Sequence, residues 1–118
     1  MRILVIDDEL AVAAVLADAL EHEGNQVTVA SSGPEGLRVL EESRPDALFL
    51  DLVMPGMDGT EVLRRIRAKD ATLPVIIVSG WATVQQIEAA KRLGVSDVVQ
   101  KPVALKHLAA ALSRLRKT

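Results

Sequence analysis

The sequence predicts an α/β fold in which a five-stranded parallel sheet is covered by helices on both faces. Strand-like and helix-like segments alternate along the whole chain, in five units spaced about 20 to 25 residues apart. Three of the strand-like segments are unbroken apolar runs: Ile3–Ile6, Ala47–Leu50 and Val75–Val78. Such runs are typical of parallel strands buried on both faces. No Ser/Gly-rich linker divides the chain, so we expect one domain over residues 1–118.

Two helices and a second strand are expected between the first two apolar runs. The first helix is predicted from apolar residues at helical spacing and stops near Gly24. These apolar residues are Val12, Val15, Leu16, Ala19 and Leu20. Val27–Val29 is predicted to be a strand. Ser32, with Glu35 three positions later, has the capping pattern that opens a short helix through Glu42.

The second half of the chain continues the alternation. Asp58–Glu61 has the same capping pattern and predicts the start of a third helix, and a fourth spans roughly Thr83–Leu93 and closes on Gly94. Asp97–Val99 is a short fifth strand, after which Lys101-Pro102 turns the chain into a last helix. The expected inward residues are Val62, Leu63 and Ile66 in the third helix and Leu105, Leu108, Leu112 and Leu115 in the last.

Composition restricts the classes of function. Apolar residues make up 49% of the chain and charged residues 25%, and the net charge of −2 comes without a basic block, so we expect no direct nucleic-acid partner. The absence of cysteine excludes disulfides, thiolate zinc sites and thiol nucleophiles, and suits a reducing cytosol. No apolar run approaches the ~20 residues of a membrane span, and no signal peptide precedes the first strand. We therefore expect a cytoplasmic protein that does not enter the membrane.

Polar residues follow four of the five strands at the edge where parallel strands end. Asp7 and Asp8 follow the first strand, Asp51 the third, Ser79 the fourth and Lys101 the fifth. Open α/β sheets place their chemistry at this carboxyl edge. If the first and third strands are neighbours, ~4.8 Å apart, the three carboxylates converge.

Converging carboxylates repel one another and raise one another's pKa values unless a cation lies among them. Oxygen ligands with open water positions favour Mg²⁺. The candidate ligands are the side chains of Asp7, Asp8 and Asp51 and the backbone carbonyl of Val53. Such a cation would allow Asp51 to accept a phosphoryl group, for which Lys101 supplies positive charge and Ser79 a hydroxyl donor. The alternatives are helix N-capping by Asp7 and Asp8, a solvated surface Lys101, and a plain turn hydroxyl at Ser79.

In this order and at these strand ends, the residues resemble the receiver domain of two-component response regulators. The resemblance extends from Arg2 to about Arg116 and is carried by Asp7-Asp8, Asp51, Met54–Gly59, Ser79-Gly80 and Lys101-Pro102. It implies a flavodoxin-like, doubly wound sheet with strand order 2-1-3-4-5. It also implies that Asp51 takes a phosphoryl group from a phosphohistidine of a sensor histidine kinase or a phosphotransfer protein. Asp8 would then bind Mg²⁺ directly and Asp7 mainly through water.

Further implications concern the phosphorylated state. Ser79 would move toward the phosphate, Lys101 would contact it, and the Lys101-Pro102 peptide bond would be cis. The implied function is a phosphorylation-driven switch that engages or releases a downstream effector domain or protein, rather than an enzyme. The cognate kinase, the output and homodimerisation are left open. Met1 is expected to be a natural start, with the domain free-standing or followed by an output domain.

Three other functions are weighed against this one. A degenerate receiver would act as a phosphorylation-independent docking module, against which the complete set of acids and Lys101 argues. An aspartyl-phosphate phosphatase of the haloacid dehalogenase type would carry a second Asp two residues after the nucleophile, where this chain has Val53. A flavin or nucleotide carrier would need a Gly- or Ser/Thr-rich phosphate loop where Asp7–Glu9 lies.

The chain also departs from the family pattern. Receivers usually carry Tyr or Phe three residues before the lysine, where this chain has Val98, and Val103 replaces a common Phe. We therefore expect the switch to use backbone shifts of the loop after Ser79 or other side chains. In that loop, Trp81 either packs on the fourth helix or, with Val53, shields the acyl phosphate. Shielding predicts slow autodephosphorylation, because neither side chain can orient an attacking water.

Overall fold

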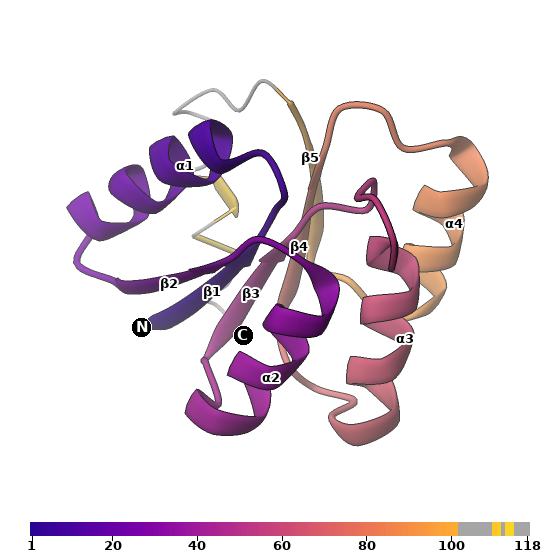
Figure 1. The fold of residues 1–118 in the computed structure, drawn as a ribbon, viewed down its shortest axis with the longest axis horizontal. Coiled ribbons are helices and arrows are strands. Elements are labelled where there is room, and N and C mark those ends of the chain that lie inside the picture. Colours follow the sequence, from indigo (N-terminus) through magenta and orange to yellow (C-terminus); the bar gives the residue numbers. More distant parts are fainter. Residues whose placement is uncertain (102–109, 112, 115–118) are drawn as a thin grey trace.

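The structure is a computed structural model and describes residues 1–101, 110–111 and 113–114. Five parallel strands form one sheet in the order β2-β1-β3-β4-β5, which confirms the expected topology (Figure 1). The strands are β1 (Arg2–Ile6), β2 (Gln26–Ala30), β3 (Ala47–Leu50), β4 (Val75–Ser79) and β5 (Asp97–Gln100). The helices with both ends described are α1 (Leu10–His22), α2 (Gly33–Ser43), α3 (Gly59–Lys69) and α4 (Val84–Arg92).

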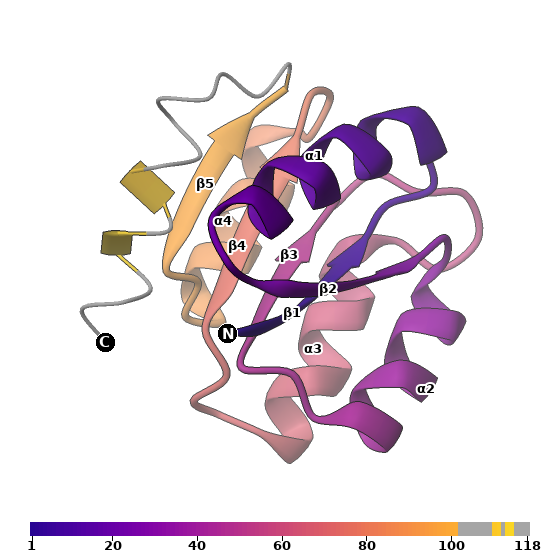
Figure 2. The ribbon, with the colours of Figure 1, turned by 90° about the vertical axis from the view of Figure 1, so that its left-hand side faces the viewer.

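Helices cover both faces of the sheet, as the unbroken apolar strands predicted. Helix α1 lies on one face, while α2, α3 and α4 lie on the other (Figures 1 and 2). Alternate residues of each central strand enter different cores: Ile3 and Val5 pack with α1, whereas Leu4 and Ile6 pack with α2 and α3. Buried Ala111 belongs to the core on the α1 side. The central strands β1, β3 and β4 therefore carry apolar residues on both faces, because helices cover both.

The predicted starts of α2 and α3 are confirmed. The Ser32 hydroxyl accepts a hydrogen bond from the Glu35 N–H at 3.3 Å, and the Asp58 carboxylate accepts one from the Glu61 N–H at 3.0 Å. The carboxylate of Glu35 turns back to the N–H and hydroxyl of Ser31 rather than to the capping serine. Each capping oxygen satisfies a helix N–H that has no partner within the helix.

One of the apolar residues that predicted the first helix does not face the core. Val15 is 72% exposed, and α1 buries a stripe shifted around the helix: Ala13, Leu16, Ala17 and Leu20. Two alanines four residues apart leave no bulk between helix and sheet, so this stripe, rather than the larger valine, faces inward. The inward residues Val62, Leu63 and Ile66 of α3 are confirmed. Those expected in the last helix, Leu105, Leu108, Leu112 and Leu115, lie outside the described residues.

Candidate functional site

The hydrogen-bond register of the sheet brings two aspartates together. Ile6 and Leu50 are partners in the β1–β3 ladder, so the residues that follow them, Asp7 and Asp51, leave the sheet side by side. The Asp51 N–H still donates to the Ile6 carbonyl at 3.0 Å, and the Asp7 N–H donates to the Ala30 carbonyl at 3.1 Å. Asp7 and Asp51 are only 2% and 3% exposed. Their positions are therefore fixed by backbone pairing in the rigid centre of the sheet.

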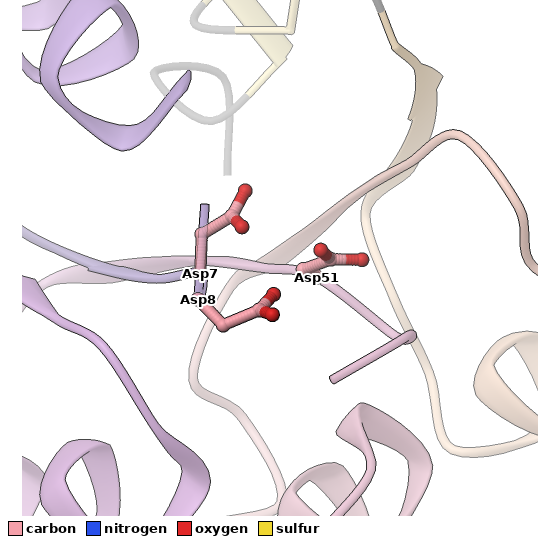
Figure 3. A group of neighbouring side chains, drawn as sticks. All are labelled: Asp7, Asp8 and Asp51. Carbon is pink, nitrogen blue, oxygen red and sulfur yellow. The ribbon is translucent and has the colours of Figure 1, made fainter. Parts of the chain in front are cut away.

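Asp8 completes what we call the acid cluster, Asp7, Asp8 and Asp51. Each of the three offers one carboxylate oxygen, and these oxygens lie within 4.8 Å of one another (Figure 3). An all-oxygen, anionic donor set of this kind fits a hard divalent cation such as Mg²⁺. Neither Asp7 nor Asp8 caps α1, because Glu9 holds the N-cap position and no side chain makes the cap hydrogen bond. N-capping therefore does not explain the pair of aspartates.

Lys101 joins the acid cluster from the end of β5. Its ammonium lies 2.8 Å from an Asp7 oxygen, 3.0 Å from an Asp51 oxygen and 2.8 Å from a Glu9 oxygen. The Lys101 side chain is 11% exposed, so the alternative of a solvated surface lysine is wrong. Glu9 was missed from the sequence as a partner of Lys101. Its position directly after Asp7-Asp8 was the available signal, but only the three-dimensional structure relates it to a residue 92 positions away.

Burial and charge act in opposite directions on these groups. Burial raises the pKa of Asp7, and the charge of Asp51 adds to this, while hydrogen bonds from Lys101 and the Glu9 N–H oppose the rise without cancelling it. For Lys101 burial lowers the pKa, but hydrogen bonds to Asp7, Glu9 and Asp51 outweigh it and the pKa is raised. The ammonium therefore stays charged at neutral pH. It is the one cation that the described residues place against these acids.

Ser79 is the last residue of β4 and stands at the same edge of the sheet. It is 7% exposed, and its buried hydroxyl has no hydrogen-bond partner among the described residues. An unsatisfied buried hydroxyl is costly and rare, so the Ser79 hydroxyl is a candidate hydrogen-bond donor to a ligand at this edge of the sheet. The Val53 N–H donates to an Asp51 oxygen at 3.0 Å, which fixes the turn after Asp51. The role of the Val53 carbonyl as a metal ligand stays a prediction.

Gly59, the first residue of α3, was also missed as a residue that supports the site. A Cβ atom at Gly59 would lie 2.2 Å from the carbonyl oxygen of Asp51 and 2.5 Å from the Cα of Leu52. The Gly59 N–H donates to the Leu52 carbonyl at 2.9 Å. The start of α3 thus packs directly on the backbone of the central aspartate. A glycine immediately after the capping Asp58 was the signal, because ordinary helix geometry does not require one there.

Trp81 and Val98, which were singled out above in relation to the family pattern, differ in their exposure. Trp81 is 88% exposed, so it neither packs on α4 nor covers the acid cluster in this conformation. Val98 is half-buried and packs against the core between the sheet and helices α3 and α4. Because this residue is a valine, the position has no aromatic ring that could rotate. The expected cis bond between Lys101 and Pro102, and Val103, lie outside the described residues.

Comparison with known proteins gives consistent matches over nearly the whole chain. Residues 3–113 match the family model of the response regulator receiver domain. Response regulator MprA of Mycobacterium avium (strain 104) is 40% identical over 119 residues, which is 100% of this chain and 52% of the relative. MprA of Mycobacterium leprae (strain TN) is 39% identical over the same shares. The chain therefore spans about half the length of the curated relatives that it matches.

Solved structures agree with these matches. A response regulator receiver domain protein (CheY-like) from Methanospirillum hungatei JF-1 superposes with a TM-score of 0.92 at 28% identity, covering 98% of this chain and 94% of that chain. A response regulator receiver domain protein from Clostridium thermocellum gives a TM-score of 0.90 at 34% identity, covering 98% and 95%. Within the described part of the chain, no helix is both long enough and apolar enough to cross a membrane.

Proposed function

The chain belongs to the response regulator receiver domain family, and from this premise we propose that it is a phosphorylation-activated switch with Asp51 as the phosphoacceptor. One observation supports the assignment most strongly. Buried Asp51 lies at the carboxyl edge of the sheet with two further aspartates and a charged Lys101 around it. A carboxylate held in this way can attack a phosphorus atom if the surrounding negative charge is screened.

The proposed donor is a phosphohistidine on a sensor histidine kinase or a phosphotransfer protein. An Asp51 oxygen attacks the phosphorus, the bond between phosphorus and the imidazole nitrogen breaks, and the aspartyl phosphate forms. One Asp51 oxygen accepts the Val53 N–H and the other faces Lys101, so the carboxylate is already oriented. Orientation of this kind removes part of the entropic barrier to transfer.

The acid cluster fits a bound Mg²⁺. Asp8 would hold the cation directly and Asp7 mainly through water, while Asp51 and the Val53 carbonyl complete the protein ligands. When bound, Mg²⁺ screens the acids and neutralises charge on the transferring phosphoryl group. Lys101 would exchange its contacts with Asp7 and Glu9 for a phosphate oxygen.

Ser79 is the residue through which phosphorylation of Asp51 would change the conformation of the rest of the fold. Its hydroxyl lacks a partner in the present conformation and would donate to a phosphate oxygen. Because Val98 cannot signal by a ring rotation, the change would pass through the backbone after Ser79 toward α4. An effector domain or protein that prefers this conformation would then be engaged or released.

The test is incubation with acetyl phosphate and Mg²⁺, followed by intact mass measurement of wild type and Asp51→Ala. We expect wild type to gain one phosphoryl group only when Mg²⁺ is present, and Asp51→Ala to gain none. In parallel, titration with Mg²⁺ alone is expected to change the fluorescence of Trp81, the single tryptophan. An adduct that persists in Asp51→Ala would contradict the assignment, and so would a wild type that remains unmodified.

A further inference from the structure

A groove of about 1020 Å³ lies between α2 and α3, far from the acid cluster. It is lined by the C-terminal halves of the two helices and by residues that precede β3 and β4. It therefore opens at the end of the sheet opposite to Asp51, and the proposed phosphorylation chemistry does not use it. We call it the α2–α3 groove.

The α2–α3 groove has an apolar floor. Leu37 and Leu40 of α2 are half-buried, and Ile66 of α3 and Leu73 from the turn before β4 pack with them into the same core. Leu37 and Leu40 are three residues apart, so they present one continuous strip along the helix. A groove with such a floor can accept large apolar side chains from a partner.

The rim of the α2–α3 groove carries more positive than negative side chains. Its exposed positive side chains are Arg38, Arg44, Arg65 and Lys69, against the acids Glu41 and Asp70. This is a local positive excess on a chain whose net charge is −2. Arg38 pairs with Glu42 and Arg65 with Glu61 on their own helices, each at 3.4 Å. These ion pairs are exposed and therefore weak, so either arginine can exchange its partner for a carboxylate of another protein.

One ion pair spans the mouth of the α2–α3 groove. Lys69 of α3 contacts Glu41 of α2, and both side chains are well exposed. Exposed ion pairs contribute little to stability, so the lysine can exchange its partner readily. A carboxylate of an incoming segment would therefore compete with Glu41 for Lys69. Asp70, in contrast, directs its carboxylate to the backbone of Thr72 and Leu73 and so competes less.

We propose that the α2–α3 groove docks an acidic amphipathic helix of a partner protein. The helix would insert apolar side chains onto the floor and pair carboxylates with the cationic rim. A second copy of this chain could offer α1, which exposes Leu10 and Val15. That contact would join two different surfaces head to tail and would build rings or open filaments, whereas most homodimers use the same surface on both copies, which favours a different protein as the partner.

The test uses a defined probe with the unphosphorylated full chain, so its result does not depend on phosphorylation at Asp51. The probe is a capped peptide of about four helical turns, with Leu along one face and Glu beside it. Matched peptides replace Glu by Gln or Leu by Ser. We expect amide NMR shifts along Leu37–Arg44 and Arg65–Asp70 with the first peptide and weaker binding of both matched peptides.

Three variants make the test specific. The double variant Arg44→Glu/Lys69→Glu is expected to weaken binding about tenfold, and Glu41→Gln to strengthen it because a competing acid is removed. Arg92→Glu, an exposed cation on α4, is the matched control and should leave affinity unchanged. The gain expected from Glu41→Gln cannot arise from misfolding. Equal binding of the Gln peptide, or self-association that the double variant abolishes, would overturn the proposal.

Discussion

At the scale of single residues, Gly59 packs closely against the backbone of the proposed acceptor. A methyl group at this position would meet the carbonyl oxygen of Asp51 at 2.2 Å, and backbone atoms cannot move aside as a flexible side chain can. We expect Gly59→Ala to lower the free energy of unfolding by about 1–3 kcal/mol and to slow phosphorylation by acetyl phosphate. Urea unfolding and intact mass over time measure the two effects.

Gly80→Ala is the matched control for this substitution. A Cβ at Gly80 would lie 3.4 Å from the Cβ of Lys101, which is an ordinary contact. We expect a much smaller loss of stability in Gly80→Ala, although Gly80 directly follows Ser79 of the candidate site. Equal losses in the two variants would mean that the contact with Asp51 is not what restricts position 59.

Val53 is the side chain expected to affect the lifetime of the aspartyl phosphate, and Trp81, which does not cover the acid cluster, is compared with it. Neither can orient a water molecule, so we expect slow hydrolysis in the wild type and a lifetime shortened severalfold in Val53→Asn. Trp81 is 88% exposed, so the effect of Trp81→Glu is expected to be the smaller of the two. Decay of the phosphoprotein, followed by intact mass after removal of the donor, compares the three proteins. Identical decay in all of them would remove the idea of shielding.

Sequence alone was sufficient to predict which residues meet at the carboxyl edge. Asp7 and Asp51 each follow an apolar strand and Lys101 follows the short fifth strand, so all three were placed at one edge, while the strand order that makes β1 and β3 neighbours came from the resemblance to receiver domains. The sequence was not sufficient to predict contacts that depend on how the helices pack on the sheet. Glu9 reaches Lys101 and Gly59 touches Asp51 because of the positions of α1 and α3, which no local pattern specifies.

At the level of elements, Asp70 organises the connection from α3 to β4. One of its oxygens accepts hydrogen bonds from the Thr72 N–H at 2.9 Å, the Thr72 hydroxyl at 3.0 Å and the Leu73 N–H at 3.0 Å. The Thr72 N–H and hydroxyl are the main reasons that the pKa of Asp70 is lowered. By analogy with helix caps, we expect Asp70→Ala to cost about 1 kcal/mol at neutral pH.

The pH dependence of this contribution has a definite sign. A carboxylate whose pKa is lowered on folding stabilises the fold above its unfolded value of about 3.9, and the contribution disappears as the pH falls through the lower folded pKa. The stability difference between wild type and Asp70→Ala should therefore shrink below about pH 4. Asp70→Asn keeps the acceptor oxygen and should lose less at neutral pH. Urea unfolding from neutral to acid pH measures all three proteins.

The elements themselves were predictable where two signals agreed. Helices α2 and α3 begin where a capping residue and an apolar stripe coincide, and β3 is both apolar and bounded by polar residues. Helix α1 is apolar on more than one face, so its spacing was compatible with several inward stripes. The apolar residues that predicted the helix therefore included the exposed Val15, and only packing of Ala13 and Ala17 on the sheet decides the orientation.

For the molecule as a whole, the acid cluster lowers the stability of the folded chain, because negative charges are held close together and partly buried. Asp7, Asp8 and Asp51 lie together at the sheet edge, Glu9 adjoins them, and Lys101 is the cation that the described residues supply. Burial raises the pKa of Asp7, which means that its ionised form is less stable in the folded chain than in the unfolded chain. Functional sites commonly lower stability in this way.

This cost leads to a prediction for Asp7→Asn. The substitution keeps an oxygen that can accept the Glu9 N–H and removes one buried charge, while Lys101 retains Asp51 and Glu9. Without divalent cations at neutral pH, we expect the variant to melt above wild type, since about 1 kcal/mol shifts the Tm of a domain of this size by about 4 °C. Asp18→Asn, an exposed acid on α1, is the control with the same change in charge.

Addition of Mg²⁺ should reverse this order. A cation that binds only the folded chain stabilises it by about 2.7 kcal/mol at a hundredfold excess over its Kd, and Asp7 is one of the residues proposed to hold it. Wild type and Asp18→Asn should therefore gain more Tm from Mg²⁺ than Asp7→Asn. Melting curves recorded with EDTA and with Mg²⁺ separate the two effects. If Asp7→Asn melted below wild type in EDTA, Asp7 would be part of what stabilises the fold, and the acid cluster would not be a cost that awaits a cation.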